Sequence, residues 1–202
     1  MSSRSLVSNL LLSSAKDMYG RFVGRVVGIS HDTMGDVAAI QVEHGGGSLA
    51  EYPMTQVSIN KNFVVLIPKW KVETNIIQKE WTLTQKKIFA LDNLLKSGKV
   101  SQAVYENLLK QEFEPVIKKL RKKRDALLSD LNSRYDEIKF QIKKFENSIA
   151  NIELERMVGG MDDQTYKTAY DSIKPLLESA LSEKKDIEAS LEQLVKLDRA
   201  YR

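Results

Sequence analysis

The residues with the clearest chemical potential are the cations of the segment KKLRKKRD. Residues four apart share one face of a helix, so Lys118 would lie beside Lys122 and Lys119 beside Lys123. A band of this kind can follow a phosphate backbone by releasing counterions, without reading the bases. The predicted nucleic-acid-binding residues of this basic band are Lys118, Lys119, Arg121, Lys122, Lys123 and Arg124.

An alternative interpretation treats the same cations as an ordinary solvated helix surface. The chain has 31 Lys and Arg against 27 Asp and Glu, so the excess of positive charge is mild and does not require an anionic partner. Acidic residues of a returning helix, such as Glu183, Asp186 and Glu188, would then pair with the band. Arg124 differs because it falls on an apolar seam, where it would either fix helix register or extend outward to water.

Other polar residues give weaker signals. Arg21 and Arg25 alternate with valines, which favours the solvent face of a strand over a second site for nucleic acid or an acidic membrane. The two histidines, His31 and His44, stand apart in turn-like segments without the spacing of metal ligands. The chain has no cysteine, and we find no nucleophile beside a base. We therefore predict no catalytic residue, no metal site and no cofactor, and a protein that is not an enzyme.

The segment SLVSNLLL near the start is apolar on one side. Leu6, Val7, Leu10 and Leu11 would form a weak membrane-binding face if this segment were helical, and polymerisation would multiply its effect. The equal alternative is an N-terminal arm that packs on the barrel or on a neighbouring molecule. Nowhere does an apolar run approach the ~20 residues that span a bilayer.

Two periodicities divide the chain. Residues 1–72 contain an arm and then short alternating segments separated by turn signals, which predicts a small all-β barrel. Residues 73–202 have the helical period, with breaks near 97–101 and 158–162. Apolar residues there recur at alternating steps of three and four, as in a coiled coil. In the last helix this seam runs through Ala180, Lys184, Ile187, Leu191 and Leu194.

The two breaks share one design. Each has a glycine suited to a helix C-cap, then a residue suited to an N-cap, then a tyrosine four residues later. The predicted reversal residues are Gly98, Ser101, Tyr105, Gly159, Gly160, Asp162 and Tyr166. Two reversals would fold three helices into an antiparallel rod, whereas parallel association between chains is the alternative. Pro115 and Pro175 predict a bend near each.

Two segments carry a resemblance to a known family. They are similar to the PRC-barrel module and read DMYGRFVGRVVGISHDTMGDVAAIQVE and NFVVLIPKWKVE. The similarity lies in Gly20, Gly24, Gly35 and the run Phe63 to Ile67. Followed by two glycine-bounded helical hairpins, the chain resembles the CdvA family of archaeal cell division proteins over nearly its whole length. The resemblance implies an α+β multidomain fold: a small N-terminal all-β PRC-type barrel followed by a long antiparallel helical coiled coil.

The resemblance also implies a function. It predicts a filament-forming cytoskeletal scaffold of the cytoplasm, located at the division site at mid-cell, that assembles on membrane or DNA and recruits the ESCRT-III homologue CdvB. The family's recruiting peptide has no counterpart in KLDRAYR or before it, so no recruiting residue is carried over. Expected partners are further copies of the chain, as homodimers and filaments, with DNA and the inner face of the membrane.

Self-association through the barrel is expected to use its last strand. The predicted residues are Phe63, Val64, Val65, Leu66 and Ile67. Two other functions stay open on the sequence. One is a non-specific DNA-binding nucleoid organiser that dimerises through its coiled coil, and the other is an RNA-maturation adaptor.

Overall fold

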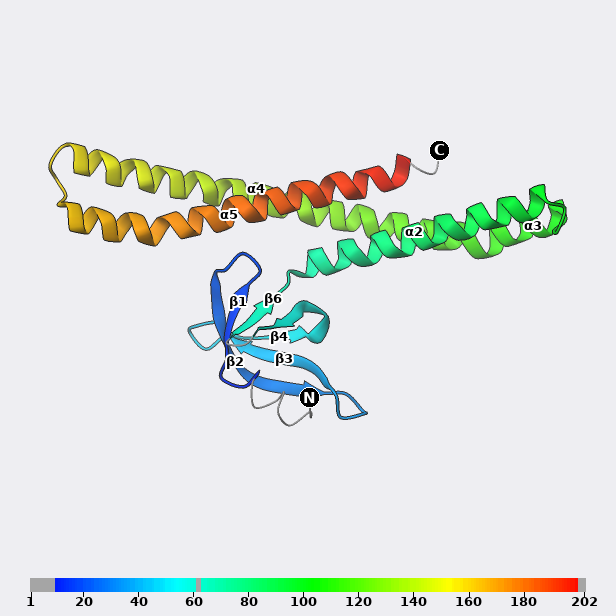
Figure 1. The fold of residues 1–202 in the computed structure, drawn as a ribbon, viewed down its shortest axis with the longest axis horizontal. Helices are drawn as coiled ribbons and strands as arrows, with labels where there is room; N and C mark the ends of the chain where they lie inside the picture. The colour runs from blue at the N-terminus through cyan, green and yellow to red at the C-terminus, as the bar shows by residue number, and fades with distance from the viewer. Residues whose placement is uncertain (1–9, 61–62, 200–202) are drawn as a thin grey trace. The chain divides into compact units, whose positions relative to one another are not determined.

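The computed structural model describes residues 10–60 and 63–199, and its N-terminal part forms a six-stranded sheet (Figure 1). The strands are β1 (Ser14–Asp17), β2 (Phe22–His31), β3 (Val37–Glu43), β4 (Leu49–Pro53), β5 (Val57–Ile59) and β6 (Phe63–Leu66). Their order is β4-β3-β2-β1-β6-β5. Neighbouring strands are antiparallel except β1 and β6, which are parallel.

The sheet is rolled, and the connection between its two end strands explains why. β4 and β5 stand at opposite ends of the strand order, yet only the 3-10 turn η1 (Met54–Gln56) joins them. In a flat sheet these strands would lie about 24 Å apart, because neighbours are ~4.8 Å apart. Four residue steps span at most about 14 Å. The sheet must therefore curl around its core, as the predicted barrel requires.

The core of the β domain follows from strand alternation. Its buried residues are Leu10, Ala15, Val26, Ile40, Val42, Val64 and Leu66. One glycine is required by close packing, since a Cβ on Gly24 would meet the carbonyl oxygen of Glu43 at 2.0 Å. That contact explains one glycine of the PRC-type pattern without any role in binding.

Between Lys69 and Arg199 the chain is mainly helical, so the predicted α+β fold class is confirmed (Figure 1). The helices are α2 (Lys69–Lys96), α3 (Gln102–Leu108), α4 (Glu114–Met157) and α5 (Asp163–Arg199), with a π-helical turn η2 (Leu109–Phe113) between α3 and α4. α2 and α3 meet at the first predicted break, and α4 and α5 meet at the second.

The two prolines are accommodated differently. The π turn η2 ends at Phe113, shortly before Pro115, and the N–H of Glu114 donates to the carbonyl of Leu109, five residues back. Such a turn widens the helix just where a proline ring would crowd the preceding carbonyls. Pro175 lies inside α5, which continues through it from Asp163 to Arg199.

The chain forms two compact units. The first combines residues 1–72 with 136–186, and the second combines residues 73–135 with 187–202. The helical segment predicted as one domain therefore divides between both units. Within the first, the sheet packs with a hairpin of α4 and α5. Within the second, α2 runs antiparallel to α3 and α4. The Tyr105–Asp92 bond joins α3 to α2, and the Lys123–Glu80 pair joins α4 to α2.

The second unit has a well-buried helical seam. Its buried residues include Ile77, Trp81, Leu91, Ile117, Leu120, Leu127, Leu131, Ile187 and Leu194. On α5 the predicted seam is wrong at two positions. Glu183 and Ser190 are 2% and 1% exposed, whereas Lys184 and Leu191 are only half-buried. The polar partners of Glu183, described below, explain its place on the buried face.

Candidate assembly and nucleic-acid surfaces

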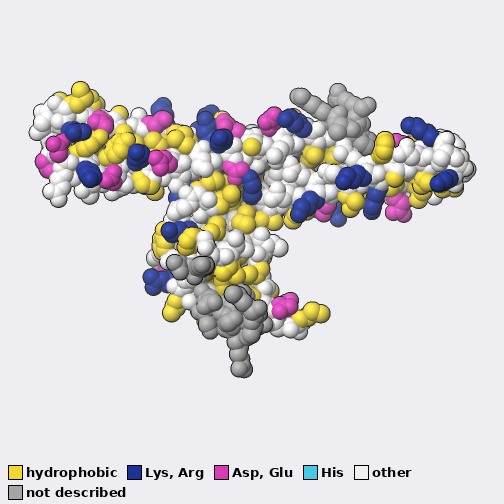
Figure 2. Space-filling model, viewed as in Figure 1, with side chains coloured by type: hydrophobic (Ala, Val, Ile, Leu, Met, Phe, Trp, Pro, Cys, Tyr) yellow, Lys and Arg dark blue, Asp and Glu magenta, His cyan; other side chains and the backbone are white. Residues whose placement is uncertain are grey.

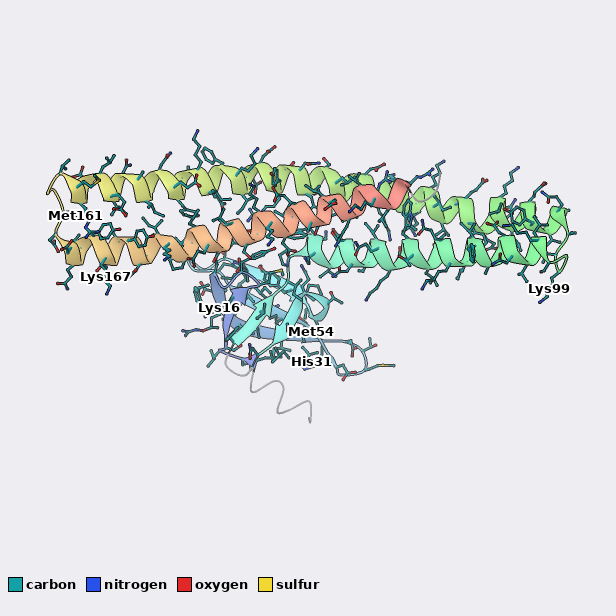
Figure 3. The ribbon with its side chains drawn as sticks, turned by 45° about the horizontal axis from the view of Figure 1, so that its top comes forward. Lys16, His31, Met54, Lys99, Met161 and Lys167 are labelled. Carbon is teal, nitrogen blue, oxygen red and sulfur yellow. The ribbon has the colours of Figure 1, made fainter. Side chains whose placement is uncertain are left out.

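The first helix reversal closes α2 and opens α3. Gly98 has φ +71°, and its N–H donates to the carbonyl of Leu95 at 2.9 Å, while the N–H of Lys99 donates to that of Leu94 at 3.0 Å. These two bonds form a Schellman cap. Ser101 then caps α3 by accepting from the N–H of Val104 at 3.4 Å. Figure 3 labels Lys99 at this turn.

The second reversal uses the same backbone bonds. Gly159 has φ +76°, its N–H donates to Arg156 at 3.1 Å, and the N–H of Gly160 donates to Glu155 at 2.9 Å. Asp162 caps α5 and accepts from the N–H groups of Gln164 and Thr165, each at 3.0 Å. Figure 3 labels Met161 within this turn.

The Thr165 hydroxyl also donates to the Asp162 carboxylate, at 2.6 Å. The pKa of Asp162 is lowered, first by this bond and then by the backbone N–H of Thr165, because both favour the charged carboxylate. Asp162 thus accepts from two backbone N–H groups, whereas Ser101 accepts from that of Val104, and the Asp162 cap titrates with pH.

Each reversal is closed by a tyrosine. The hydroxyl of Tyr105 donates to Asp92 at 2.7 Å, and that of Tyr166 donates to Glu153 at 2.5 Å. Both bonds reach back 13 residues across the turn. The tyrosine four residues after the cap thus links the helix after the turn to the helix before it, which explains why the motif contains a tyrosine.

The basic band lies on the first half of α4. Lys118, Lys119, Arg121, Lys122 and Lys123 are exposed to solvent. Lys123 lies 3.5 Å from the Glu80 carboxylate of α2. The structure therefore keeps these five cations on the surface of α4.

Arg124 does not belong to the exposed band. It is 8% exposed, its guanidinium lies 5.8 Å from the centre of the Trp81 ring, and it donates to Asp125 at 2.7 Å. The prediction that Arg124 binds nucleic acid is therefore wrong for the folded chain. The residue stacks within the helical seam, and its aromatic and carboxylate contacts suit a planar guanidinium.

Arg21, one of the two predicted cations of the β domain, is bound by carboxylates of its own chain. Its Nε donates to Asp17 at 2.5 Å, and its Nη2 donates to Glu183 of α5. Burial alone would lower the pKa of Arg21, but the bonds to Glu183 and Asp17 outweigh it, so the pKa is raised. Arg25, by contrast, is exposed on β2. Of this predicted pair, only Arg25 is presented to solvent as a nucleic-acid contact requires.

Further polar contacts join the β domain to α5 beside Arg21. The Tyr19 hydroxyl donates to Asp186 at 3.1 Å, Lys71 forms an ion pair with Asp186, and the Ser179 hydroxyl donates to the Tyr19 carbonyl at 2.9 Å. Burial, followed by the charge of Asp186, raises the pKa of Tyr19, which keeps the phenol protonated as a donor. We call this contact the polar clasp; it consists of Tyr19, Arg21, Lys71, Ser179, Glu183 and Asp186.

Sequence reasoning did not find the polar clasp. Its two sides lie more than 100 residues apart, and no periodic pattern links them. One signal was available: Glu183 falls three residues after Ala180 and four before Ile187, which is a seam position for a charged residue.

The predicted self-association strand divides into two faces. Val64 and Leu66 are 1% and 4% exposed and belong to the core of their own domain. They are not available to a second copy, so that part of the prediction is wrong. Phe63 and Val65 point to the other face and are half-buried, as is Ile67. Lys16 lies over the Phe63 ring at 5.1 Å.

The predicted membrane face is only partly described. Leu6 and Val7 lie outside the described residues. Leu10 is fully buried in the β core, so its assignment to a membrane is wrong, while Leu11 is 40% exposed. Between residues 10 and 199, leaving out 61–62, no helix combines the length and the apolar character needed to cross a bilayer.

The hairpin of the first unit leaves its seam incompletely covered. Phe145, Ile149 and Ile152 of α4, and Ile173 and Leu177 of α5, are all half-buried; we call this set the half-buried seam. Figure 2 shows hydrophobic side chains among the charged ones along this hairpin. A pair of helices cannot enclose its own apolar stripe, because each helix covers only one side of the other.

Comparison with known proteins identifies the family of this chain. Residues 69–201 match the model of the CdvA-like coiled-coil domain. The chain belongs to the CdvA-like family. It is also 22% identical over 194 residues to a protein named Cell division protein A from Sulfolobus acidocaldarius, an alignment that covers 96% of this chain and 81% of that protein. The resemblance to the CdvA family is thus confirmed.

Proposed function

We propose that this chain is a self-assembling structural scaffold of archaeal cell division. Membership of the CdvA-like family and the similarity to Cell division protein A support the division role. The self-assembling part of the proposal goes further and rests on the surfaces of the helical hairpins. Catalysis plays no part in it, and the helices act through packing.

The observation that carries the proposal is the half-buried seam. Along α4, Ile138 is fully buried, yet Ile149 and Ile152, one to two heptads onward, are half-buried. Burying an apolar side chain fully is worth roughly 1.5–3 kcal/mol. Covering these five half-buried residues would therefore stabilise the association of this hairpin with a further one. A second hairpin packed on this seam would complete a four-helix arrangement. The outward residues Phe63 and Val65 offer a second contact in the β domain.

Repeated contacts of two kinds would build filaments. A chain that joins others through two different surfaces forms an open polymer when the contacts do not close a ring. In a cell, we propose that such filaments assemble at mid-cell in the cytoplasm, on the inner face of the membrane or on DNA. Recruitment of the ESCRT-III homologue CdvB belongs to the same proposal, on the strength of the family resemblance.

Electron microscopy of the purified chain tests the proposal. Samples with and without DNA, at several salt concentrations, should contain filaments even when DNA is absent. An Ile149→Glu variant should lose them, while Asn151→Glu, an exposed change on the same helix, should keep them. Discrete dimers under all conditions would contradict the scaffold proposal.

A second candidate function is non-specific DNA binding by the basic band. The supporting observation is the exposure of Lys118, Lys119, Arg121, Lys122 and Lys123 on one stretch of α4. Each phosphate neutralised adds about 0.9 to the slope of log affinity against log salt concentration.

Neutralising the exposed lysines tests this candidate. Changing Lys118, Lys119 and Lys122 to Gln should therefore weaken DNA binding and flatten that slope by about 2 to 3. The matched control changes three other exposed lysines, Lys139, Lys143 and Lys167. Equal effects of both triple variants would exclude the band as a specific surface.

A further inference from the structure

The turn between α4 and α5 carries strongly exposed apolar side chains (Figure 2). Leu154, Met157 and Val158 are 59%, 81% and 77% exposed. Residues three and four apart share one face of a helix, and the N–H of Val158 still donates to the carbonyl of Leu154 at 3.1 Å. The three side chains therefore form one ridge, which we call the apolar tip. Exposed apolar patches mark surfaces that bind other molecules.

The hairpin of α2 with α3 and α4 has an open apolar groove. Its volume is about 440 Å³, within the range of ~300–1,000 Å³ that is typical of binding pockets. Among the residues that line it, Leu91 is buried, and Leu108 and Phe113 are half-buried. Leu94 and Val116 also line it and are 39% and 42% exposed. This surface, which we call the hairpin groove, thus leaves apolar side chains open to water.

The apolar tip and the hairpin groove of one chain cannot meet. Val116 of the groove and Leu154 of the tip both lie on α4, which is one continuous helix of 44 residues. At 1.5 Å per residue, the stretch of helix between them is about 57 Å long. A straight helix of this length holds the two surfaces apart, so a second copy is needed to bring a tip and a groove together.

The charges around the two surfaces are complementary. Residues 153–163 contain four acids against one cation, namely Glu153, Glu155, Asp162, Asp163 and Arg156. Residues 86–99, on the α2 side of the groove, contain four cations against one acid, namely Lys86, Lys87, Lys96, Lys99 and Asp92. Glu112 lines the groove from the opposite side. Attraction therefore turns the acidic surroundings of a docked tip toward α2 and sets the orientation of the contact.

We propose that the apolar tip of one copy inserts into the hairpin groove of a second copy. Helices commonly bind in this way, through residues at i, i+3 and i+4 that anchor them in an apolar groove. This inference rests on the proposed self-assembly and names a contact for it that is separate from the half-buried seam. Because tip and groove are different surfaces, each added copy presents one of each to further copies. The contact therefore builds an open polymer unless it closes a ring.

Disulfide cross-linking between two single-cysteine chains tests the contact, because the chain has no cysteine of its own. Met157→Cys mixed with Leu94→Cys should oxidise to a cross-linked pair of unlike chains, which intact mass spectrometry identifies. The matched control mixes Met157→Cys with Asn93→Cys, since Asn93 is exposed on α2 but does not line the groove. A disulfide needs Cβ atoms about 4 Å apart, so the yield should exceed that of the control at least about fivefold. Equal yields would overturn the proposal.

A charge placed in the groove makes the result independent of one cysteine pair. Val116→Glu, added to the Leu94→Cys chain, should lower the yield about tenfold, because a docked tip would bury the introduced carboxylate. Gln111→Glu adds the same charge to η2 at an exposed residue that does not line the groove, and should change the yield less than about twofold. Equal losses would show that charge alone governs the yield and would overturn the contact. Helical circular dichroism checks the fold, and the comparison of Leu94 with Asn93 stands without these variants.

The outcome is distinguishable from that of the proposed function. Cross-linked pairs above the control yield, from a protein that forms no filaments in the electron microscope, would keep this contact and contradict the scaffold. Filaments whose cysteine variants give only the control yield would keep the scaffold and overturn this contact.

Discussion

The two helical hairpins of this protein turn in the same way but are buried differently. Both reversals use a left-handed glycine, a capped next helix and a tyrosine bonded to an acid 13 residues back. In the unit that contains α2, the seam residues Leu120 and Leu127 are 2% and 3% exposed. In the other hairpin, Phe145 and Ile149 stay half-buried.

The comparison separates local from non-local causes. A reversal is set within about a dozen residues, so the same residue types produce it twice. Burial depends on what packs against the hairpin, and the two hairpins differ in that respect. The hairpin with the half-buried seam is therefore the part of the molecule where a second copy would add most stability.

The largest expected effect comes from placing a charge on each kind of seam. Ile138→Asp, at a fully buried position of α4, should lower the free energy of unfolding by more than about 3 kcal/mol, because it buries a charge and removes packing. Ile149→Asp on the same helix should cost about 1 kcal/mol in dilute solution. Urea denaturation measures both, and equal losses would show that the two seams are equally buried.

The reversals should respond alike to loss of glycine. Gly98→Ala and Gly159→Ala should each lower stability by about 1–2 kcal/mol, since both residues have positive φ and an added Cβ would meet nothing within 4 Å. Gly160→Ala is the control, because Gly160 lacks the positive φ and its added Cβ meets the flexible side chain of Glu155. Thermal unfolding compares the three, and a Gly160 variant as unstable as Gly159→Ala would contradict this assignment.

The tyrosine bonds should contribute less. Tyr105→Phe removes the bond to Asp92 and should cost about 0.5–1.5 kcal/mol. Tyr166→Phe, which removes the bond to Glu153, should change stability in the same direction. Melting temperatures of both variants measure the effects, and the pairing across the turns would lose its support if neither variant melted earlier than wild type.

The smallest effect distinguishes the two caps by pH. The pKa of Asp162 is lower folded than unfolded, so its contribution is present above the unfolded value, near pH 4, and is lost as pH falls through the folded value. Between pH 5 and 2, wild type should lose more melting temperature than Asp162→Asn. Ser101→Ala should show the same pH dependence as wild type. Parallel curves for wild type and Asp162→Asn would contradict a titrating cap.

Sequence patterns predicted what depends on neighbours along the chain. The short strands and both reversals follow from alternation, glycines and caps. The predicted buried seam of α5 was wrong at Lys184 and Leu191, because a pattern of apolar residues does not predict that the charged Glu183 is buried. Arg21 holds that carboxylate from 162 residues away. The polar clasp is a long-range fit of charges, and a single sequence carries no periodic signal for it.

The most direct test measures distances between copies at the half-buried seam. The chain has no cysteine, so a single Asn151→Cys can carry one spin label beside Ile149 and Ile152. Any dipolar distance observed by pulsed electron paramagnetic resonance is then between chains. Self-association through this seam predicts a narrow distance distribution that disappears on dilution with unlabelled protein and in Ile149→Glu. Assembled protein in which this label gives no defined distance would contradict the seam as the joint between copies.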